Sequence, residues 1–210
     1  MSENSCFYGS HVPQPITPAK AAAHFATITR HRLIVRKLCF ECGLYRQGML
    51  HDLSKYSPEE FLVGARYFSG SESPNNEERR VRGYSSSWLH HKGRNKHHYE
   101  YWLDYSVRMI PGGYRPVRMP GCYVAEMFCD RVAASKIYRG EKYRDSDPLR
   151  YYLGSTTARF LHPDTAALLE KLLRMLAEKG EETTCGYIRT HMHKHTLEQE
   201  LHSCGLFCNG

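Results

Sequence analysis

The stretch over residues 17–42 carries its apolar residues with a helical period, and this constrains the fold more than any other feature. Thr17-Pro18 is a helix-start signal, because a hydroxyl can cap the first turn and proline fits its backbone. Apolar residues such as Phe25 and Val35 follow a repeat of about 3.6 residues better than an alternation. Gly43 is a natural stop. We therefore expect one long helix here.

Other parts of the chain carry helix signals of the same kind, and no alternating strand pattern or internal repeat stands out. Residues 69–79 are polar and rich in helix breakers, which predicts a surface loop. The predicted fold class is all-α, a helical bundle. The further helices that we expect lie over residues 44–56, 57–68, 87–103, 121–139 and 162–180.

The length of 210 residues suits one main domain with a sizeable core. We expect an irregular N-terminal segment over 1–16, a helical domain over 17–180 and a C-terminal helical extension over 181–210. No apolar run approaches the roughly 20 residues that span a bilayer, and residues 1–16 lack the pattern of a secretion signal. We therefore expect a cytoplasmic protein without a membrane partner.

Charge and cysteine content narrow the range of partners. The formal net charge of +7 favours an anionic partner such as a phosphate ester, a nucleotide or nucleic acid, although a basic solvated surface explains it equally well. The chain has 8 cysteines, and we expect reduced thiols because no secretion signal is present. Cys39 and Cys42 form a lone CxxC, which two small buried residues on one helix face explain more simply than a zinc or redox site.

The 13 histidines fall in pairs and clusters, and this pattern indicates a metal site. His51-Asp52 combines a nitrogen and a carboxylate oxygen, a set that suits zinc, manganese, iron or nickel. Adjacent residues on a helix point about 100° apart, so both reach one ion only at an edge or a helix end. Further ligands must therefore come from elsewhere, with His31 as the best first candidate and His24 as its alternative.

Asp130 is the best last candidate ligand. Its helix is otherwise apolar, and an inward-facing carboxylate there needs a partner, which a metal can provide. The competing interpretation is a surface salt bridge with Arg131 or Lys136.

Four histidines between Trp88 and Trp102 form a second concentration of possible ligands. On one continuous helix His91 and His98 would share a face, and His90 and His97 would share another. One pair could ligate while the other binds substrate. The neighbouring basic residues Lys92, Arg94 and Lys96 suit a phosphate-binding mouth, or alternatively a basic, aromatic surface for RNA or DNA.

The ordered set His31, His51-Asp52 with Lys55, and Asp130 resembles the HD-domain superfamily of metal-dependent phosphohydrolases. Residues 51–61, His-Asp-Leu-Ser-Lys-Tyr-Ser-Pro-Glu-Glu-Phe, together with the histidines of 90–98, are more closely similar to the uncharacterised DUF5662 family. The resemblance covers roughly residues 24–175.

The resemblance implies that the domain over 17–180 is an HD-domain-like helical bundle that binds metal, holding one or two divalent ions of Mn, Fe, Co, Ni or Zn. It makes Asp52 and Lys55 the catalytic residues, with Asp52 able to bridge two ions. The implied metal ligands are His31, His51, Asp52, His91, His98 and Asp130. The residues expected to bind substrate are Lys55, His90, Arg94, Asn95, Lys96 and His97.

The implied activity is hydrolysis of a nucleotide or other small phosphate ester by a metal-activated water. Lys55, Arg94 or Lys96 would stabilise the charge that develops on the phosphate. A di-iron HD-type oxygenase of a small molecule would use the same ligands and is an open alternative. A non-enzymatic nucleic-acid or protein-binding module is another, with nucleic acid possible but not favoured. An oligomer is compatible with each of these.

Overall fold

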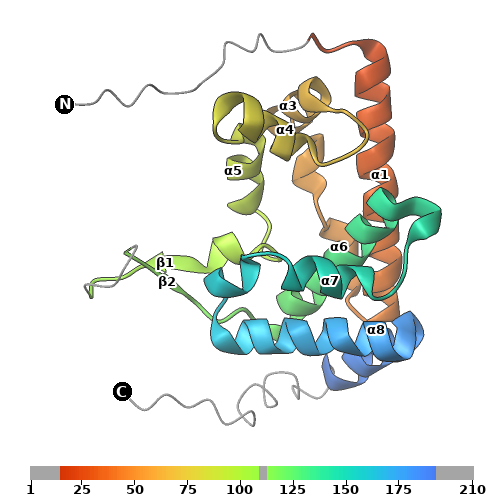
Figure 1. Ribbon diagram of the computed structural model, residues 1–210, viewed down its shortest axis with the longest axis vertical. Helices are drawn as coiled ribbons and strands as arrows, with labels where there is room; N and C mark the ends of the chain where they lie inside the picture. The colour runs from red at the N-terminus through yellow and green to blue at the C-terminus, as the bar shows by residue number, and fades with distance from the viewer. Residues whose placement is uncertain (1–14, 109–112, 193–210) are drawn as a thin grey trace. The chain divides into compact units, whose positions relative to one another are not determined.

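A computed structural model describes residues 15–108 and 113–192, and these are mostly helical, which confirms the all-α class (Figure 1). The described residues form two compact units. The first unit contains the residues up to Arg30 together with Asp52–Arg94, and the second contains His31–His51 and the residues from Asn95 onward. Residues 1–14 and 193–210, which include most of both predicted terminal segments, lie outside the described residues.

Helix α1 (Pro18–Glu41) is the long helix that the apolar period predicts. Gly43 follows it with φ of 78°, a left-handed conformation that glycine adopts without steric cost. Helix α2 (Tyr45–Leu50) comes next. In the second unit the Arg32 side chain donates to the backbone carbonyls of His51 and Met49, at 2.7 and 3.3 Å, and so fixes the chain where α2 ends.

The first unit continues with the 3₁₀ helix η1 (Leu53–Tyr56) and helices α3 (Pro58–Tyr67), α4 (Pro74–Arg82) and α5 (Ser86–Lys92). The predicted loop over 69–79 was wrong in its second half, where α4 begins. Pro74 fits the first turn of that helix, and Arg80 pairs with Glu77 at 2.8 Å and with Glu72. A solvated helix and a polar loop have the same composition, so composition alone was misleading.

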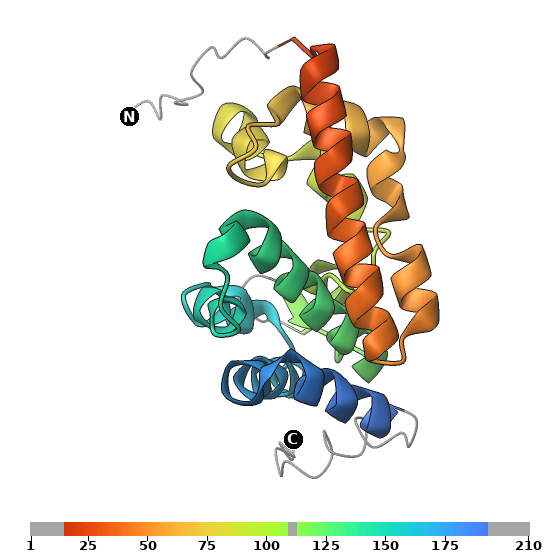
Figure 2. The same ribbon diagram turned by 90° about the vertical axis from the view of Figure 1, so that its right-hand side faces the viewer.

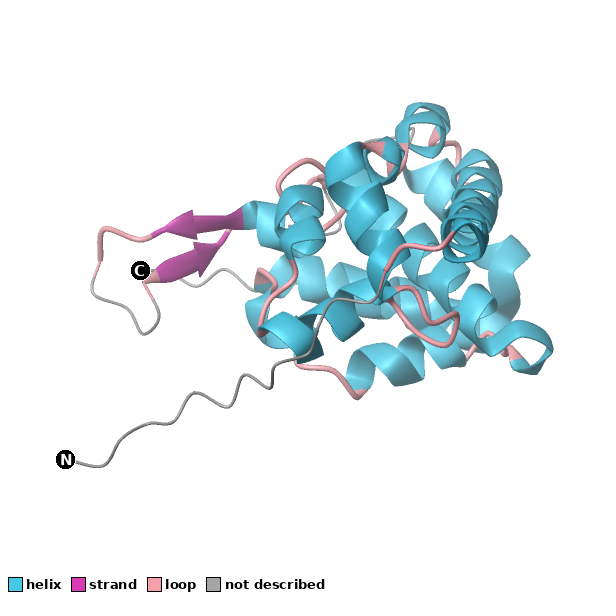
Figure 3. Cartoon of the chain, turned by 90° about the horizontal axis from the view of Figure 1, so that it is seen from above, coloured by secondary structure: helices cyan, strands magenta, loops and turns pink. Residues whose placement is uncertain are grey.

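The helix predicted over 87–103 was also wrong beyond Lys92, because the chain leaves the helix at Gly93. The second unit then contains the 3₁₀ helix η2 (Tyr99–Trp102) and an antiparallel hairpin of β1 (Leu103–Tyr105) and β2 (Tyr114–Pro116), seen in Figure 3. Strands of three residues are too short for an alternating pattern to be detected. The helical register that paired His91 with His98 therefore does not exist.

The remaining elements are α6 (Gly121–Arg139), η3 (Gly140–Lys142), α7 (Asp147–Leu153), η4 (Thr157–Phe160) and α8 (Pro163–Met192). Helix α6 matches the predicted range. The last helix was expected to end at Gly180. Instead Gly180, with φ of 79°, interrupts α8, which continues in a new direction to Met192 (Figure 2).

The core of the second unit joins the C-terminal part of α1 to α6 and α8. Cys39 and Cys42 are fully buried in it as unoxidised thiols, and the Cys42 sulfur lies 3.9 Å from that of Cys129. This placement fits the interpretation of the CxxC as small core residues. No helix in residues 15–108 or 113–192 is both long and apolar enough to cross a membrane. Large side chains of this core include Leu38, Phe128, Leu169, Leu172, Leu173, Leu176 and Ile188.

His24, the alternative first ligand, is buried in the first unit beside two phenylalanine rings. Its ring lies 5.3 Å from the ring of Phe61 and 5.6 Å from that of Phe68, and its Nε2 faces Gly64. Burial, reinforced by the positive charge of Lys55, lowers the pKa of His24 from 6.5 to about 4. The ring is therefore neutral in the folded protein at neutral pH.

This pKa predicts a loss of stability in acid. Between pH 6.5 and about 4 the unfolded chain binds a proton at His24 that the folded chain does not bind. The contribution is complete above pH 6.5, falls as the pH drops, and levels off below about 4, with a loss of about 2 kcal/mol after allowance for solvent screening. The free energy of unfolding, measured with urea at several pH values in this range, should fall less steeply with decreasing pH in His24→Leu than in wild type. The same pH dependence of the unfolding free energy in both proteins would contradict the lowered pKa of His24.

Candidate metal centre

His51 and Asp52 lie between two helices, which corrects the predicted continuous helix over 44–56. Helix α2 ends at Leu50 and η1 begins at Leu53. His51 is extended, with φ of −49° and ψ of 125°, whereas Asp52 is left-handed, with φ of 52° and ψ of 27°. Both side chains are almost completely buried. The pair thus sits at a helix end, the kind of place where neighbouring ligands are sterically possible.

In the second unit, His51 lies among histidine and carboxylate side chains from α1 and α6. The Nε2 of His31 is 2.9 Å from Oδ1 of Asp130, and the Nε2 of His51 is 3.7 Å from the same oxygen. One possible ligand atom from each of these three residues lies within 4.8 Å of the others. The structure therefore brings together three of the predicted ligands, which are distant in the sequence.

The same unit contains a further group that the sequence analysis did not assign. Oε1 of Glu126 lies 2.9 Å from Nδ1 of His51 and 3.1 Å from Nδ1 of His97. These three residues also form a group able to hold a metal ion. Glu126 precedes Asp130 by four residues on α6, so both face the same side of that helix. The spacing of Glu126 and Asp130 could therefore have indicated from the sequence that Glu126 belongs to this site. For His97, the sequence analysis predicted a role in substrate binding.

We call the five residues of this unit the second-unit cluster: His31, His51, His97, Glu126 and Asp130. Burial alone would raise the pKa of Asp130, but its hydrogen bonds with His31 and His51 outweigh burial and hold that pKa well below its usual range. Burial likewise opposes ionisation of Glu126, yet hydrogen bonds with His51 and His97 lower its pKa. Both carboxylates are therefore anionic at neutral pH.

The first unit has its own arrangement of charged groups around Asp52. Nζ of Lys55 lies 2.7 Å from Oδ2 of Asp52, and Nε2 of His91 lies 3.3 Å from Oδ1. On the other side of the ring, Nδ1 of His91 is 2.7 Å from Oε2 of Glu60. Nδ1 of His90 is also 2.7 Å from Glu60, at Oε1. We call these five residues the first-unit cluster.

The electrostatics of the first-unit cluster favour positive charge at His91. Burial would lower the pKa of His91, but the negative charge of Asp52 and hydrogen bonds with Asp52 and Glu60 raise it overall. Burial would raise the pKa of Glu60, and its bonds with His91 and His90 lower it. A cation, whether a proton or a metal ion, is therefore stabilised beside Asp52.

Glu60 does not have the capping role that its position in the sequence predicts. The pattern Ser57-x-x-Glu60 predicted a capping box, in which the glutamate reaches back to the start of its own helix. Its side chain instead turns to the two histidines of α5 and is almost completely buried. No sequence signal distinguishes these two uses of a glutamate at this position.

The other residues expected to bind metal or substrate lie in varied surroundings. The ring of His98 is 4.1 Å from the ring of His97 and is partly buried. Arg94 and Lys96 are exposed, and Asn95 is partly buried. The ammonium of Lys96 lies over the Tyr101 ring at 5.6 Å. The roles proposed for these residues stay predictions.

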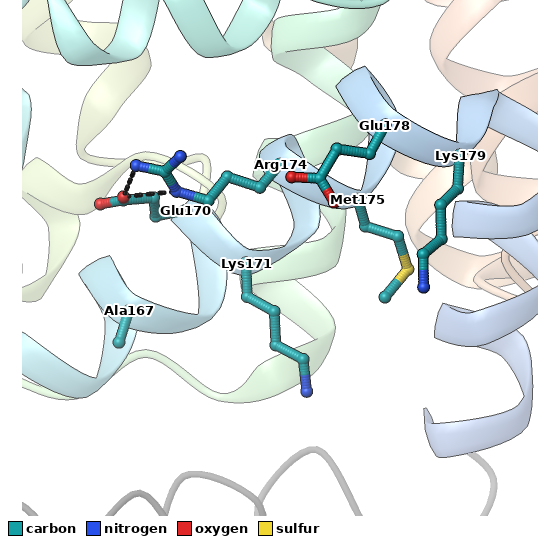
Figure 4. A pocket seen from close by; sticks show the side chains of 7 residues that line it. All are labelled: Ala167, Glu170, Lys171, Arg174, Met175, Glu178 and Lys179. Atoms are coloured by element: carbon teal, nitrogen blue, oxygen red, sulfur yellow. Dashed lines mark hydrogen bonds and ion pairs between the residues drawn. The ribbon is translucent and has the colours of Figure 1, made fainter.

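A hollow along α8 is lined mainly by charged side chains, and the described residues that line it include no histidine. Figure 4 shows the side chains of Glu170 and Arg174 paired along one face, beside Met175. The two charged groups are 2.7 Å apart. Opposite charges paired one turn apart along a helix are typical of a solvated helix face. The hollow therefore adds nothing to the histidine–carboxylate clusters.

The donor set fits a divalent transition metal. Imidazole nitrogens with carboxylate oxygens suit Zn, Mn, Fe, Co and Ni, and burial of several anions together favours a cation among them. The fold and these residues define a mostly helical protein of the all-α class whose histidine, aspartate and glutamate side chains can hold a metal ion.

Comparison with known proteins places this chain in a family. The model of a family of unknown function, DUF5662, matches residues 20–175, so the chain belongs to that family. No curated protein and no solved structure matches it significantly.

Proposed function

We propose that the protein is a metal-dependent phosphohydrolase of the HD-domain type, acting on a nucleotide or another small phosphate ester. The observation that supports this most is the convergence of His31, His51 and Asp130 in the second unit, within 4.8 Å and largely buried. These residues occur in the order His, His-Asp, Asp that resembles HD-domain phosphohydrolases. The net charge of +7 is compatible with an anionic substrate.

Three residues of the second-unit cluster would hold the ion. A bound divalent ion lowers the pKa of a coordinated water and stabilises charge on a phosphoryl oxygen. His31, His51 and Asp130 are the proposed ligands, and Asp52, which follows His51 directly in the chain, is proposed as a further ligand. Two metal ions, with His91 and His98 as additional ligands, remain part of the proposal.

Lys55 has a proposed role in both positioning and substrate binding. Its ammonium pairs with Asp52 at 2.7 Å, which holds that carboxylate in one orientation. The lysine side chain is 28% exposed, whereas that of Asp52 is 1% exposed, so Lys55 also presents positive charge toward solvent. A phosphate oxygen is the natural partner for such a charge.

The test is an elemental analysis of protein purified without a histidine tag, followed by a phosphatase screen over nucleotides with Mn, Co, Ni and Zn. We expect about one or two metal ions per chain and phosphate release that stops when a chelator is added. Iron with oxygen consumption and no phosphate release would favour the oxygenase. Protein without stoichiometric metal, whose properties a chelator leaves unchanged, would overturn the proposal.

A further inference from the structure

Two buried glutamates are used in the same way, each holding a pair of histidines by their Nδ1 atoms. Glu126 contacts His51 and His97, and Glu60 contacts His90 and His91, with N–O distances of 2.7 to 3.1 Å. Glu60 and Glu126 are both about 5% exposed. We propose that these glutamates are positioning residues that hold the proton of their histidines on Nδ1 and so leave Nε2 of His51 and His91 to face the metal, an inference that rests on the proposed metal centre.

The selection follows from the hydrogen-bonding capacity of the two groups. A neutral imidazole carries one N–H, and an ionised carboxylate can only accept. When both nitrogens of a neutral imidazole face carboxylates, the proton is held on the nitrogen with the shorter contact. Nδ1 is closer to its glutamate than Nε2 is to its aspartate in both His51, at 2.9 against 3.7 Å, and His91, at 2.7 against 3.3 Å, so Nε2 presents a lone pair. In the second unit Nε2 of His51 faces Asp130, and in the first unit Nε2 of His91 faces Asp52. Both nitrogens thus face an anionic oxygen that a metal ion can share.

The two glutamates differ in one respect that makes the inference testable. Glu126 accepts from both of its histidines through the single atom Oε1. Glu60 uses one oxygen for each histidine, Oε1 for His90 and Oε2 for His91. A glutamine has one accepting oxygen and one donating NH₂ group. Glutamine at 126 can therefore accept from both histidines, whereas glutamine at 60 can accept from only one.

The experiment is long-range ¹H–¹⁵N correlation NMR of the histidine rings, recorded on metal-free protein over a pH series, with the tautomer of each ring read where its own spectrum shows one protonated nitrogen. Wild type should show the Nδ1–H form for all four histidines. Glu126→Gln should keep it for His51 and His97. Glu60→Gln should convert one of His90 and His91 to the Nε2–H form, because that ring now faces an NH₂ donor. Glu78→Gln is the matched control. Glu78 is buried in the first unit, like Glu60, but accepts hydrogen bonds from Ser85 and Ser86 instead of histidines.

Alanine variants then connect the tautomer to metal binding. Glu60→Ala and Glu126→Ala should weaken metal affinity by about 10- to 100-fold, measured with Zn²⁺ against a chromophoric chelator. Nε2–H forms in wild type, or ring signals unchanged in Glu60→Gln, would overturn the inference. Because the spectra need no metal, the expected tautomers in a protein that binds none of Mn²⁺, Fe²⁺, Co²⁺, Ni²⁺ and Zn²⁺ would refute the proposed function and leave the histidine orientation established.

Discussion

Replacing His51 with alanine should leave the protein without its bound metal, the largest functional loss expected from a single substitution. His51 is the residue that both possible metal-holding groups of the second unit share, since it lies 2.9 Å from Glu126 and 3.7 Å from Asp130. Loss of a direct ligand should weaken Zn²⁺ or Mn²⁺ binding by more than about 100-fold, beyond the usual effect of losing an outer partner. Elemental analysis and chelator competition measure this directly.

A matched control is available in the same unit. His191 stacks on Tyr187 near the end of α8, outside both clusters, and His191→Ala should keep full metal content. If His51→Ala fails to fold because it leaves buried carboxylates without a partner, His51→Gln serves as the second variant. Stoichiometric metal in a folded His51 variant would show that the metal is held elsewhere.

The largest expected loss of stability comes from Gly64→Ala. A Cβ atom at this position would lie 2.4 Å from Nε2 and 2.7 Å from Cε1 of His24. Neither side can move easily, because the histidine ring is buried among aromatic rings. We expect the free energy of unfolding to fall by about 3 kcal/mol, at the upper end for an overpacked core. Urea unfolding with a constant m value would measure this loss.

The steric cause can be separated from an ordinary helix effect. His24→Ala removes the ring, so the double variant His24→Ala/Gly64→Ala should be less destabilised than the sum of the two single variants predicts. Gly186→Ala is the control, since nothing lies within 4 Å of its added Cβ in α8, and it should be neutral or slightly stabilising. Additive losses in the double variant would exclude the clash as the cause.

The long helices were predictable because their signals are redundant. Helix α1 has a start signal, an apolar period and a stop at Gly43. Helix α6 is also long enough, at 19 residues, for its apolar positions to show a helical period. The short elements had no such redundancy. Three-residue strands carry no readable alternation. The stop signal of Gly93, where α5 ends, was outweighed by the helical spacing of the histidines on its two sides. Local propensity therefore identified the framework and missed the segment that carries His97 and His98.

The candidate site was predictable where residue type restricts the chemistry. Histidine and aspartate in an ordered series indicated His31, His51 and Asp130, and the second unit brings these together. Glutamates have many ordinary uses, so the roles of Glu60 and Glu126 emerge only when their neighbours in space are known. The pairing of His97 with Glu126 likewise depends on how the chain turns after Gly93, which side-chain chemistry does not determine.

The left-handed backbone at Asp52 offers a way to change charge without changing shape. Aspartate and asparagine both tolerate this conformation, because their short polar side chains can bond locally, whereas alanine there incurs about 1 kcal/mol of strain. Asp52→Asn is therefore the informative substitution in any assay of this position. In an alanine scan, the loss of stability caused by backbone strain at Asp52 would be mistaken for the loss of its carboxylate.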